Sequence, residues 1–387
     1  MKITDVQACV IGEQVPHSGG SVWTFVRIYT DEGIVGTGEC NSGGPGASGF
    51  ATKAAIIAMR DLIIGEDPFN INKIYEKLRR NGRYGGTSNA PIIFALTGID
   101  NALYDICGKA LGVPVYKLLG GKFRDKIRLY ADCHAGEEES VKAYAEKAIE
   151  RVEQGFSAVK FDVDSTGVGK LDPFNWTVGA KEMTYIISLI EGLRDAIGFE
   201  IDLAIDCHGQ FDLPSAITLA KAVEPLRLLW LEEPVPAENV SALAQVKASS
   251  STVICSGENQ YTRFEFLELF NARAVDVIMP DLAKAGGIAE AKRIADLADA
   301  HYIPIAPHNV STPHGMMASA HVMASVPNFL VLEFHALEIP WWSDLCDGDK
   351  PFYKDGFMTV SERPGIGVEL NDDVAKRLLW NGDTYFD

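Results

Sequence analysis

Ionisable residues recur along this 387-residue chain at the points where short apolar runs end. From Asp206 onward, successive groups of this kind follow at intervals of 26, 26, 23, 27 and 25 residues. Such intervals fit one strand, one helix and their connections, so each repeat would deliver one ionisable side chain at the same height. One buried carboxylate can be structural, but a regular series predicts a catalytic site. Its members, with a lysine and an aspartate from one run earlier, are Lys160, Asp162, Asp206, Glu232, Glu258, Asp281, His308 and Glu333.

Three carboxylates of this series predict a metal site. Asp206, Glu232 and Glu258 come from consecutive runs and offer only oxygen, which suits a hard cation such as Mg2+. Without a cation they would repel one another and raise each other's pKa, and the segments AIDCHG, WLEEP and SGEN supply no adjacent lysine or arginine. Glu233 competes with Glu232 for the ligand role, because strand alternation does not settle the choice without a register.

Two further groups predict acid-base chemistry. Asp281 and His308 end neighbouring runs, where the carboxylate can accept an imidazole N–H, raise the pKa of the histidine and orient it as a base. His314 competes with His308, but it lies beyond the run and is expected to cap the following helix. Lys160 and Asp162 stand two residues apart in one run, so both should point into the same pocket.

The elements that position these groups are expected to form an α/β fold. Eight apolar runs separated by amphipathic helical patterns predict a closed (β/α)8 barrel over residues 123–345, with its active site at the carboxyl ends of the strands. Residues 1–122 begin with alternating segments and continue with helical patterns, which predicts an α+β capping domain. Residues 346–387 are too few for a domain and are expected to return to the capping domain.

Composition narrows the class of protein. A net charge of −18 without a basic cluster argues against binding to nucleic acid or to an anionic membrane. If the substrate is an anion, this field opposes its approach, so the site needs positive charge of its own, such as a metal ion. The seven cysteines are scattered and form no C-x-x-C pair, which argues against disulfides and a zinc site. The N-terminus lacks the apolar core of a signal peptide, so a cytoplasmic location is expected.

Taken together, these motifs resemble the enolase superfamily, in its mandelate racemase subgroup. The likeness rests on VKFD, IDCHG, WLEEP, SGEN, MPDLAKAGG, APHN and LEF, in this order along nearly the whole chain. It implies that Asp206, Glu232 and Glu258 bind Mg2+, which selects the first glutamate of the EEP segment. It also implies that His308, paired with Asp281, is the general base and acid, and that Glu333 binds the substrate carboxylate. Lys160 and Lys284 match lysines of the family's site, although Lys284 could equally be a structural partner of the carboxylates.

One departure from the resemblance selects the reaction. Racemases of this subgroup carry a second lysine where this chain has Asp162, and racemisation needs a base on both faces of the α-carbon. One base, His308, instead fits abstraction of the α-proton, an enediolate stabilised by Mg2+ and Lys160, and loss of the β-hydroxyl. His208, two residues beyond Asp206, would protonate the leaving hydroxide. The hypothesis is an Mg2+-dependent dehydratase, a hydro-lyase that converts an aldonate or aldarate to a 2-keto-3-deoxy acid.

Two alternatives remain open at the level of sequence. One is a racemase, epimerase or cycloisomerase that uses Lys160 as a second base, and the other is a catalytically silent module that binds metal and sugar acid. The resemblance implies that loops of the capping domain select the substrate, here 15–24 with His17 and Trp23, and 81–89 with Arg83 and Tyr84. It also implies a homo-oligomer, such as an octamer, and a small-molecule sugar acid as partner.

Overall fold

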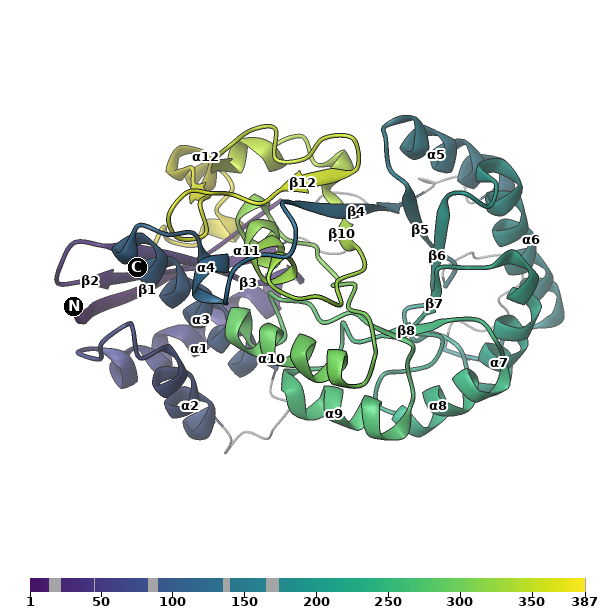
Figure 1. Ribbon diagram of the computed structural model, residues 1–387, viewed down its shortest axis with the longest axis horizontal. Helices are drawn as coiled ribbons and strands as arrows, with labels where there is room; N and C mark the ends of the chain where they lie inside the picture. Colours follow the sequence, from purple (N-terminus) through teal and green to yellow (C-terminus); the bar gives the residue numbers. More distant parts are fainter. Residues whose placement is uncertain (14–21, 45, 83–89, 135–139, 165–173, 387) are drawn as a thin grey trace.

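The computed structural model describes residues 1–13, 22–44, 46–82, 90–134, 140–164 and 174–386. Its amino-terminal part is a three-stranded antiparallel sheet in the order β1-β2-β3 with helices packed against it (Figure 1). The elements are β1 (Ile3–Gly12), β2 (Val22–Thr30), β3 (Val35–Gly44), α1 (Gly46–Ile63), α2 (Ile71–Gly82), α3 (Ala90–Leu111) and α4 (Val115–Leu118).

Helix α3 lies unusually close to strand β3. A Cβ atom at Gly36 would stand 2.2 Å from the carbonyl oxygen of Ala102, and one at Gly38 would stand 2.0 Å from that of Gly98. Only glycine permits this approach. By length and composition α3 could cross a membrane, but 78% of its apolar window is buried inside the protein, as in the core helix of a globular domain.

The second part of the chain is a parallel barrel (Figure 1). The order β10-β4-β5-β6-β7-β8-β9 is closed through Ile305, which bridges Ile278 on one side and Phe329 on the other. The strands are β4 (Lys126–Cys133), β5 (Ala158–Asp162), β6 (Asp202–Asp206), β7 (Trp230–Glu232), β8 (Ile254–Ser256), β9 (Val277–Ile278) and β10 (Leu332–Phe334). The predicted α/β barrel with a capping domain is confirmed.

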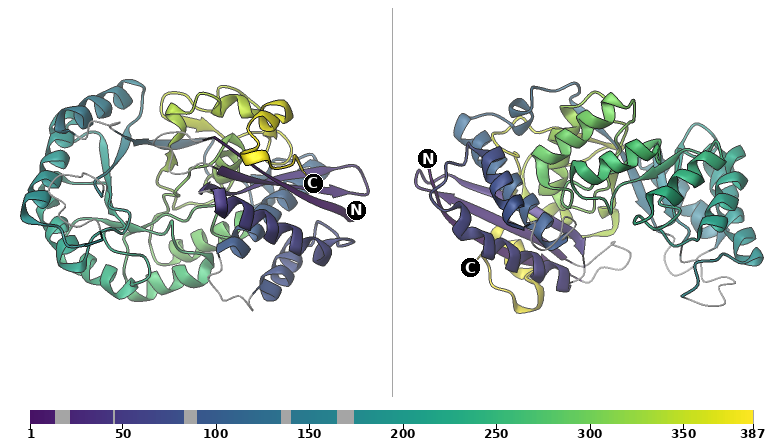
Figure 2. Two further views of the ribbon diagram at one scale, coloured as in Figure 1. Left: turned by 180° about the vertical axis from the view of Figure 1, so that it is seen from behind. Right: turned by 90° about the horizontal axis from the view of Figure 1, so that it is seen from below.

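An outer ring of helices covers the barrel, and the capping domain packs against one side of this ring (Figures 1 and 2). The ring consists of α5 (Val141–Glu153), α6 (Ala180–Ile197), α7 (Leu213–Ala222), α8 (Val240–Ser249), α9 (Thr262–Ala272), α10 (Gly287–Ala300) and α11 (Pro313–Ala324). After β10 the described chain forms two short 3-10 helices, η3 (Ala336–Glu338) and η4 (Trp342–Leu345), where an eighth α-helix would complete the repeat.

The carboxyl-terminal segment contacts both parts of the molecule. Strand β12 (Phe357–Thr359) pairs antiparallel with β4 of the barrel, while the backbone N–H of Gly12 donates to the carbonyl of Leu378 at 2.8 Å. Lys53 and Asp383 add an ion pair of 2.7 Å between α1 and the chain end. The remaining elements are β11 (Cys346–Asp347), β13 (Glu369–Leu370), α12 (Asp372–Arg377) and η5 (Trp380–Gly382). The contact with the capping domain was expected, whereas that with the barrel was not; the boundaries at 122 and 345 stay predictions.

Two buried carboxylates of the capping domain hold barrel helices at what we call the seam. Glu39 on β3 accepts hydrogen bonds from the backbone N–H groups of Thr312, at 2.9 Å, and Gly315, at 2.8 Å, and from the Thr312 hydroxyl. Asp100 on α3 accepts from the N–H of Ala289 at 3.0 Å. Both carboxylates thus meet unpaired N–H groups at the amino ends of α11 and α10. These helices follow the strand ends that carry His308 and Asp281, so the seam lies beside that side of the site.

Candidate active site

The site is built by alternation along the barrel strands. A separate buried cluster lines the barrel interior, consisting of Tyr130, Ala158, Ala204, Trp230, Cys255, Val277, Met279, Ala306 and Val331. Side chains two residues further along a strand point the same way but nearer its carboxyl end. In this outer layer lie Asp132, Lys160, Asp206, Glu232, Asp281, His308 and Glu333.

Lys160 is the central cation of this layer. Its Nζ lies 2.8 Å from Glu333 Oε1, 2.9 Å from Asp206 Oδ2, 3.2 Å from Glu232 Oε1 and 3.9 Å from Asp132 Oδ1. Burial lowers the pKa of Lys160, but the surrounding carboxylates outweigh it and hold the pKa well above its ordinary value. One ammonium group is therefore shared among four carboxylates.

The register separates the two glutamates of the WLEEP segment. Glu232 faces Lys160 and accepts a hydrogen bond from Trp230 Nε1 at 2.8 Å. Glu233 faces away from Lys160, and its carboxylate accepts from Asn259 Nδ2 at 2.7 Å. Burial and the neighbouring Glu258 raise the pKa of Glu233 to about 8. The register thus places Glu232 in the layer with Lys160, a choice that alternation had left open, and the role of Glu232 as a metal ligand stays a prediction.

Glu258 reaches the site through a break in the alternation. It follows Gly257, whose φ of 144° is rarely adopted by residues with a side chain, and a Cβ there would lie 2.9 Å from the backbone nitrogen of Met279. The Oε2 atom of Glu258 lies 3.0 Å from His308 Nε2. The structure thus places Glu258 beside the histidine, while Asp206 and Glu232 lie beside Lys160.

His308 and Asp281 form the predicted pair. His308 Nδ1 lies 2.8 Å from Asp281 Oδ2, and Lys284 Nζ approaches the same oxygen at 3.3 Å. Burial lowers the pKa of His308, but Glu258 and Glu333 outweigh it and raise the pKa. Because Nδ1 of His308 is occupied by Asp281, Nε2 is the imidazole nitrogen that faces the pocket. Lys284 contacts the carboxylate of Asp281. The substrate role predicted for Lys284 stays a prediction.

Glu333 lies between Lys160 and the imidazole. Its Oε2 accepts a hydrogen bond from the backbone N–H of Asn309 at 2.7 Å and lies 3.8 Å from His308 Nε2. The carboxylate is thereby held from both sides.

His208 stands at the open side of the layer. Its Nδ1 lies 3.2 Å from Asp164 Oδ1 and its Nε2 lies 3.6 Å from Asp206 Oδ2. Burial lowers the pKa of His208, but Asp206, Asp164 and Asp162 outweigh it and raise the pKa to about 11. A φ of 43° at His208 and of 34° at Glu233 are uncommon for residues with side chains. Such backbone conformations cluster at functional sites.

Asp162 does not contact the lysine that shares its strand. Its Oδ2 lies 3.5 Å from His134 Nδ1, and burial together with Asp132 and Asp206 holds its pKa well above the ordinary value. The alternation placed Asp162 in the pocket, and the contact to His134 assigns it a partner that sequence reasoning did not name.

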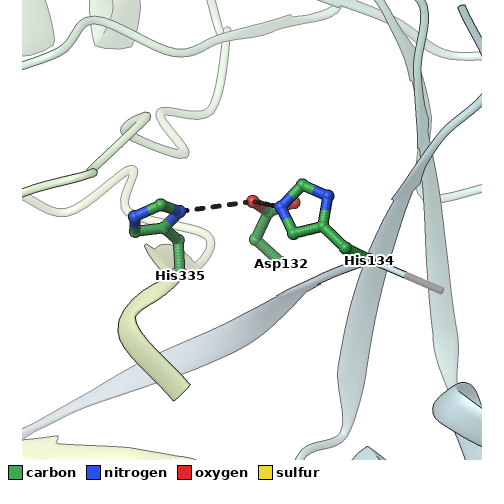
Figure 3. A group of neighbouring side chains, drawn as sticks. All are labelled: Asp132, His134 and His335. Carbon is green, nitrogen blue, oxygen red and sulfur yellow. Dashed lines mark ion pairs between the residues drawn. The ribbon is translucent and has the colours of Figure 1, made fainter. Parts of the chain in front are cut away.

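Three groups of the site escaped sequence reasoning. Asp132 and His134 end the first barrel strand and His335 follows the last, and their side chains meet at the barrel mouth (Figure 3). The predicted series of ionisable strand ends begins with Lys160 in the second run, whereas Asp132 ends the first run. His134 and His335 lie two residues beyond Asp132 and Glu333, and the same alternation could have found them.

The predicted specificity residues are only partly visible. Trp23 is fully buried, donates its indole N–H to the carbonyl of Val310 at 2.7 Å and meets the edge of Trp341 at 5.5 Å between ring centres. It joins the capping domain to the barrel, and its contact with substrate stays a prediction. His17, Arg83 and Tyr84 lie outside the described residues. A cavity of about 610 Å3 adjoins the site at His208, Glu233 and Asn259.

His314 is not part of the layer. It is the second residue of α11, and the cap of that helix is Thr312, whose hydroxyl accepts from the His314 N–H at 3.3 Å. Burial lowers the pKa of His314 to about 4, so the imidazole is neutral. The prediction that His314 caps the helix was wrong, because Thr312 is the cap. The expectation that His314 lies outside the catalytic layer agrees with the structure.

The electrostatics of the layer fit a divalent cation. Besides burial, Asp206 raises the pKa of Glu232 well above its ordinary value, and neighbouring carboxylates do the same for Glu233 and Asp162. A bound cation would relieve this repulsion. Within the described ranges, Asp162, Asp206 and His208 each offer one ligand atom within 4.8 Å of the others, as do Asp132, His134 and His335. The predicted trio Asp206, Glu232 and Glu258 is not gathered as tightly, because Glu258 is paired with His308.

Comparison with known proteins identifies the family. Residues 17–120 match the N-terminal domain of mandelate racemase and muconate lactonizing enzyme, and residues 143–374 match the enolase C-terminal domain-like family. The chain belongs to this enolase-like family. The resemblance stated from the motifs is thus confirmed. Members of the enolase superfamily use a divalent metal ion, which agrees with the potential metal-binding groups of the site.

Individual relatives of this enolase-like chain cover nearly all of it. D-xylonate dehydratase of Haloferax volcanii is 40% identical over 100% of this chain and 91% of its own length. D-galactonate dehydratase of Pectobacterium atrosepticum is 36% identical over 91% of this chain and 90% of its own length. A solved structure, of a mandelate racemase/muconate lactonizing enzyme-like protein from Rubrobacter xylanophilus, is 44% identical with a TM-score of 0.93 and covers 100% of this chain and 99% of that one.

Proposed function

We propose that this protein is an Mg2+-dependent hydro-lyase that dehydrates an aldonate to a 2-keto-3-deoxy acid. The observation that carries the proposal is the placement of two histidines near Lys160. His308 can act as a base when it is neutral, and His208, which is positively charged, can act as an acid. The names of the relatives, which are dehydratases of xylonate and galactonate, support a monoacid sugar as substrate. A cytoplasmic location and a homo-oligomer remain part of the proposal.

Asp206, Glu232 and Glu258 would hold the Mg2+, since they offer the oxygen ligands that it prefers. Bound there, Mg2+ would supply Lewis-acid stabilisation for the negative charge that develops on the substrate carboxylate. The ammonium group of Lys160 would stabilise the same negative charge. Glu333, which contacts Lys160, accepts a hydrogen bond from the Asn309 N–H and is thereby held toward the site of the substrate carboxylate.

His308 would remove the α-proton through Nε2. Asp281 would accept a hydrogen bond from the Nδ1–H group, 2.8 Å away, and so favour the tautomer in which Nε2 can accept a proton. The charge of Glu258 is the main cause that raises the pKa of His308 against the effect of burial. Neutralising that charge would lower the pKa of His308 toward the range in which an imidazole works as a base.

His208 would complete the reaction as the acid. A pKa of about 11 keeps its imidazole protonated at neutral pH, so it can give a proton to the departing β-hydroxyl. The C–O bond then breaks with both electrons on the oxygen, water leaves, and the resulting enol tautomerises to the 2-keto acid. The three aspartates around His208 that raise its pKa would favour reprotonation after each turnover.

The same geometry disfavours an epimerase. That reaction would require Lys160 to act as the second base, and a base must be deprotonated before it abstracts a proton. Burial lowers the pKa of Lys160, but Glu232, Glu333 and Asp206, together with Tyr130, outweigh it and hold the pKa well above its ordinary value. The ammonium form is therefore strongly favoured, and Lys160 serves better as an electrostatic partner than as a base.

The test is a screen of aldonates and aldarates with Mg2+ in D2O, in which the keto product is detected with semicarbazide. We expect a keto acid from at least one aldonate, and at least a 10²-fold loss of turnover in His308→Asn with unchanged Mg2+ binding. His301→Asn, a change on the opposite end of the barrel, is the control. If the substrate exchanges its α-proton for deuterium or is inverted and no keto acid forms, the protein is an epimerase and not a dehydratase. Tight aldonate binding without turnover or exchange would leave only a binding module.

A further inference from the structure

The described chain holds a second cluster of metal-type ligands at the barrel mouth, which the proposed reaction does not use. Asp132, His134 and His335 come from the first and last barrel strands, and Asp132 stands between the two imidazoles (Figure 3). His134 Nε2 lies 3.6 Å and His335 Nδ1 lies 3.7 Å from Asp132 Oδ2. One ligand atom from each residue lies within 4.8 Å of the other two.

These separations are longer than hydrogen bonds, whose donor and acceptor are commonly about 2.7–3.2 Å apart. Two ligands about 2.0–2.1 Å from a tetrahedral metal stand ~3.4 Å apart, which is close to the distances observed. The two separations between the carboxylate oxygen and the imidazole nitrogens are therefore close to those of ligands that share a metal ion.

The surroundings of His134 fit a metal ligand as well. Its Nε2 faces Asp132, while its Nδ1 lies 3.5 Å from Asp162 Oδ2. Histidines that bind metal commonly have a carboxylate beside their other ring nitrogen, and Asp162 is the carboxylate that lies on that side of His134, at ion-pair distance. Asp162 would then orient His134 as a metal ligand, a role that involves neither proton transfer nor a contact with Lys160.

His335 supplies a further sign. The residue is only 7% exposed, and its Nε2 atom has no hydrogen-bond partner among the described residues. Within the described part of the chain, the ring meets Asp132 through Nδ1 at 3.7 Å. An ion between Nδ1 and Asp132 would give both of these buried groups a partner at bonding distance.

We propose that Asp132, His134 and His335 form a second metal site for a transition metal of the Zn2+ class. Two imidazoles and one carboxylate suit Zn2+, whereas Mg2+ prefers an all-oxygen set. Three protein ligands leave one tetrahedral position for water or for a hydroxyl oxygen of a bound molecule. The site is distinct from Asp206, Glu232 and Glu258, and it stands whether or not the dehydratase proposal holds.

Equilibrium dialysis of the full-length protein against Zn2+ in saturating Mg2+ tests the site. We expect one Zn2+ per chain that Mg2+ does not displace, with Co2+ giving the strong visible absorption of a tetrahedral centre. His335→Gln and, independently, His134→Gln should lose this ion. Asp162→Asn should weaken Zn2+ binding by about 10- to 100-fold.

His208→Gln and His301→Gln are the controls, because one belongs to the other Asp/His group and the other lies far from the mouth. Both should retain the ion, and thermal unfolding shows whether each variant is folded. The proposal is overturned if no Zn2+ binds, if Mg2+ or Glu258→Gln removes it, or if folded His335→Gln and His134→Gln both keep it.

Discussion

Carboxylates are buried in two regions of this protein, the seam and the catalytic layer, and the two regions satisfy them differently. At the seam, Glu39 receives backbone and hydroxyl donors from the start of α11. In the layer, Asp206, Glu232 and Glu333 share the single ammonium of Lys160. Burial alone therefore does not identify a functional carboxylate; a shortage of positive charge among clustered carboxylates does.

The difference has an energetic consequence. The donors at the seam belong to a helix terminus, so they serve the folded state and nothing else. The repulsion between the carboxylates of the layer destabilises the folded protein, and a bound cation would relieve it. We therefore expect removal of a carboxylate to destabilise the protein at the seam and to stabilise the metal-free protein in the layer.

The largest effect is expected from Glu39→Ala. The change leaves two N–H groups and one hydroxyl of the seam without an acceptor, and each buried unsatisfied group costs about 1–3 kcal/mol. The free energy of unfolding, measured with urea in EDTA, should fall by about 3 kcal/mol or more. Glu39→Gln keeps an acceptor oxygen and should cost about 1 kcal/mol.

Equal losses in the two Glu39 variants would show that the hydrogen bonds at the seam contribute little. Because Glu39 touches α11 and not the layer, Mg2+ binding to the folded variants should match that of the unchanged protein. A loss of Mg2+ affinity in Glu39→Gln would mean that the two regions are coupled.

Sequence reasoning found the layer more easily than the seam, for a physical reason. Alternation along a strand is fixed by backbone geometry, so Lys160, Asp206 and His308 could be placed from spacing alone. Glu39 lies in GTGEC, whose pattern gives no sign of the partner, because Thr312 is 273 residues away along the chain. Contacts between distant segments depend on how domains pack, and no local pattern records that.

The choice between Glu232 and Glu233 marks the same limit. Alternation predicts that the two face opposite ways, but the register that decides which one faces Lys160 comes from pairing with β6, where Asp206 is opposite Glu232. Asp132 and His134 stand at the end of the first strand, which the series of ionisable groups did not include, and His335 lies two residues beyond Glu333, where alternation predicts the same direction.

The second effect has the opposite sign and a smaller size. Glu232→Gln removes a carboxylate whose pKa is raised by burial and by Asp206, while the amide can still accept from Trp230. The metal-free protein should become more stable by about 1–2 kcal/mol, and Mg2+ should no longer raise its stability. Urea unfolding with EDTA and with Mg2+ measures both. Destabilisation in EDTA would show that Lys160 alone satisfies the layer.

The most gradual effect is the pH dependence of the seam. Burial raises the pKa of Glu39 from 4.5 in the unfolded chain to about 7 in the fold. Between these values the folded protein binds the extra proton, so the contribution of this carboxyl group to stability is present at low pH and is lost as the pH rises through about 7.

Glu39→Gln does not titrate at this position and serves as the matched reference. The free energy of unfolding of the unchanged protein, relative to that of Glu39→Gln, should fall between about pH 5 and 7 by no more than ~1.4 kcal/mol per pH unit. Urea unfolding of both proteins in EDTA across this range gives the difference directly. If the difference is constant, the three donors at the seam hold Glu39 ionised in spite of its burial. The seam would then resemble an ordinary helix cap, and its contrast with the catalytic layer would be sharper still.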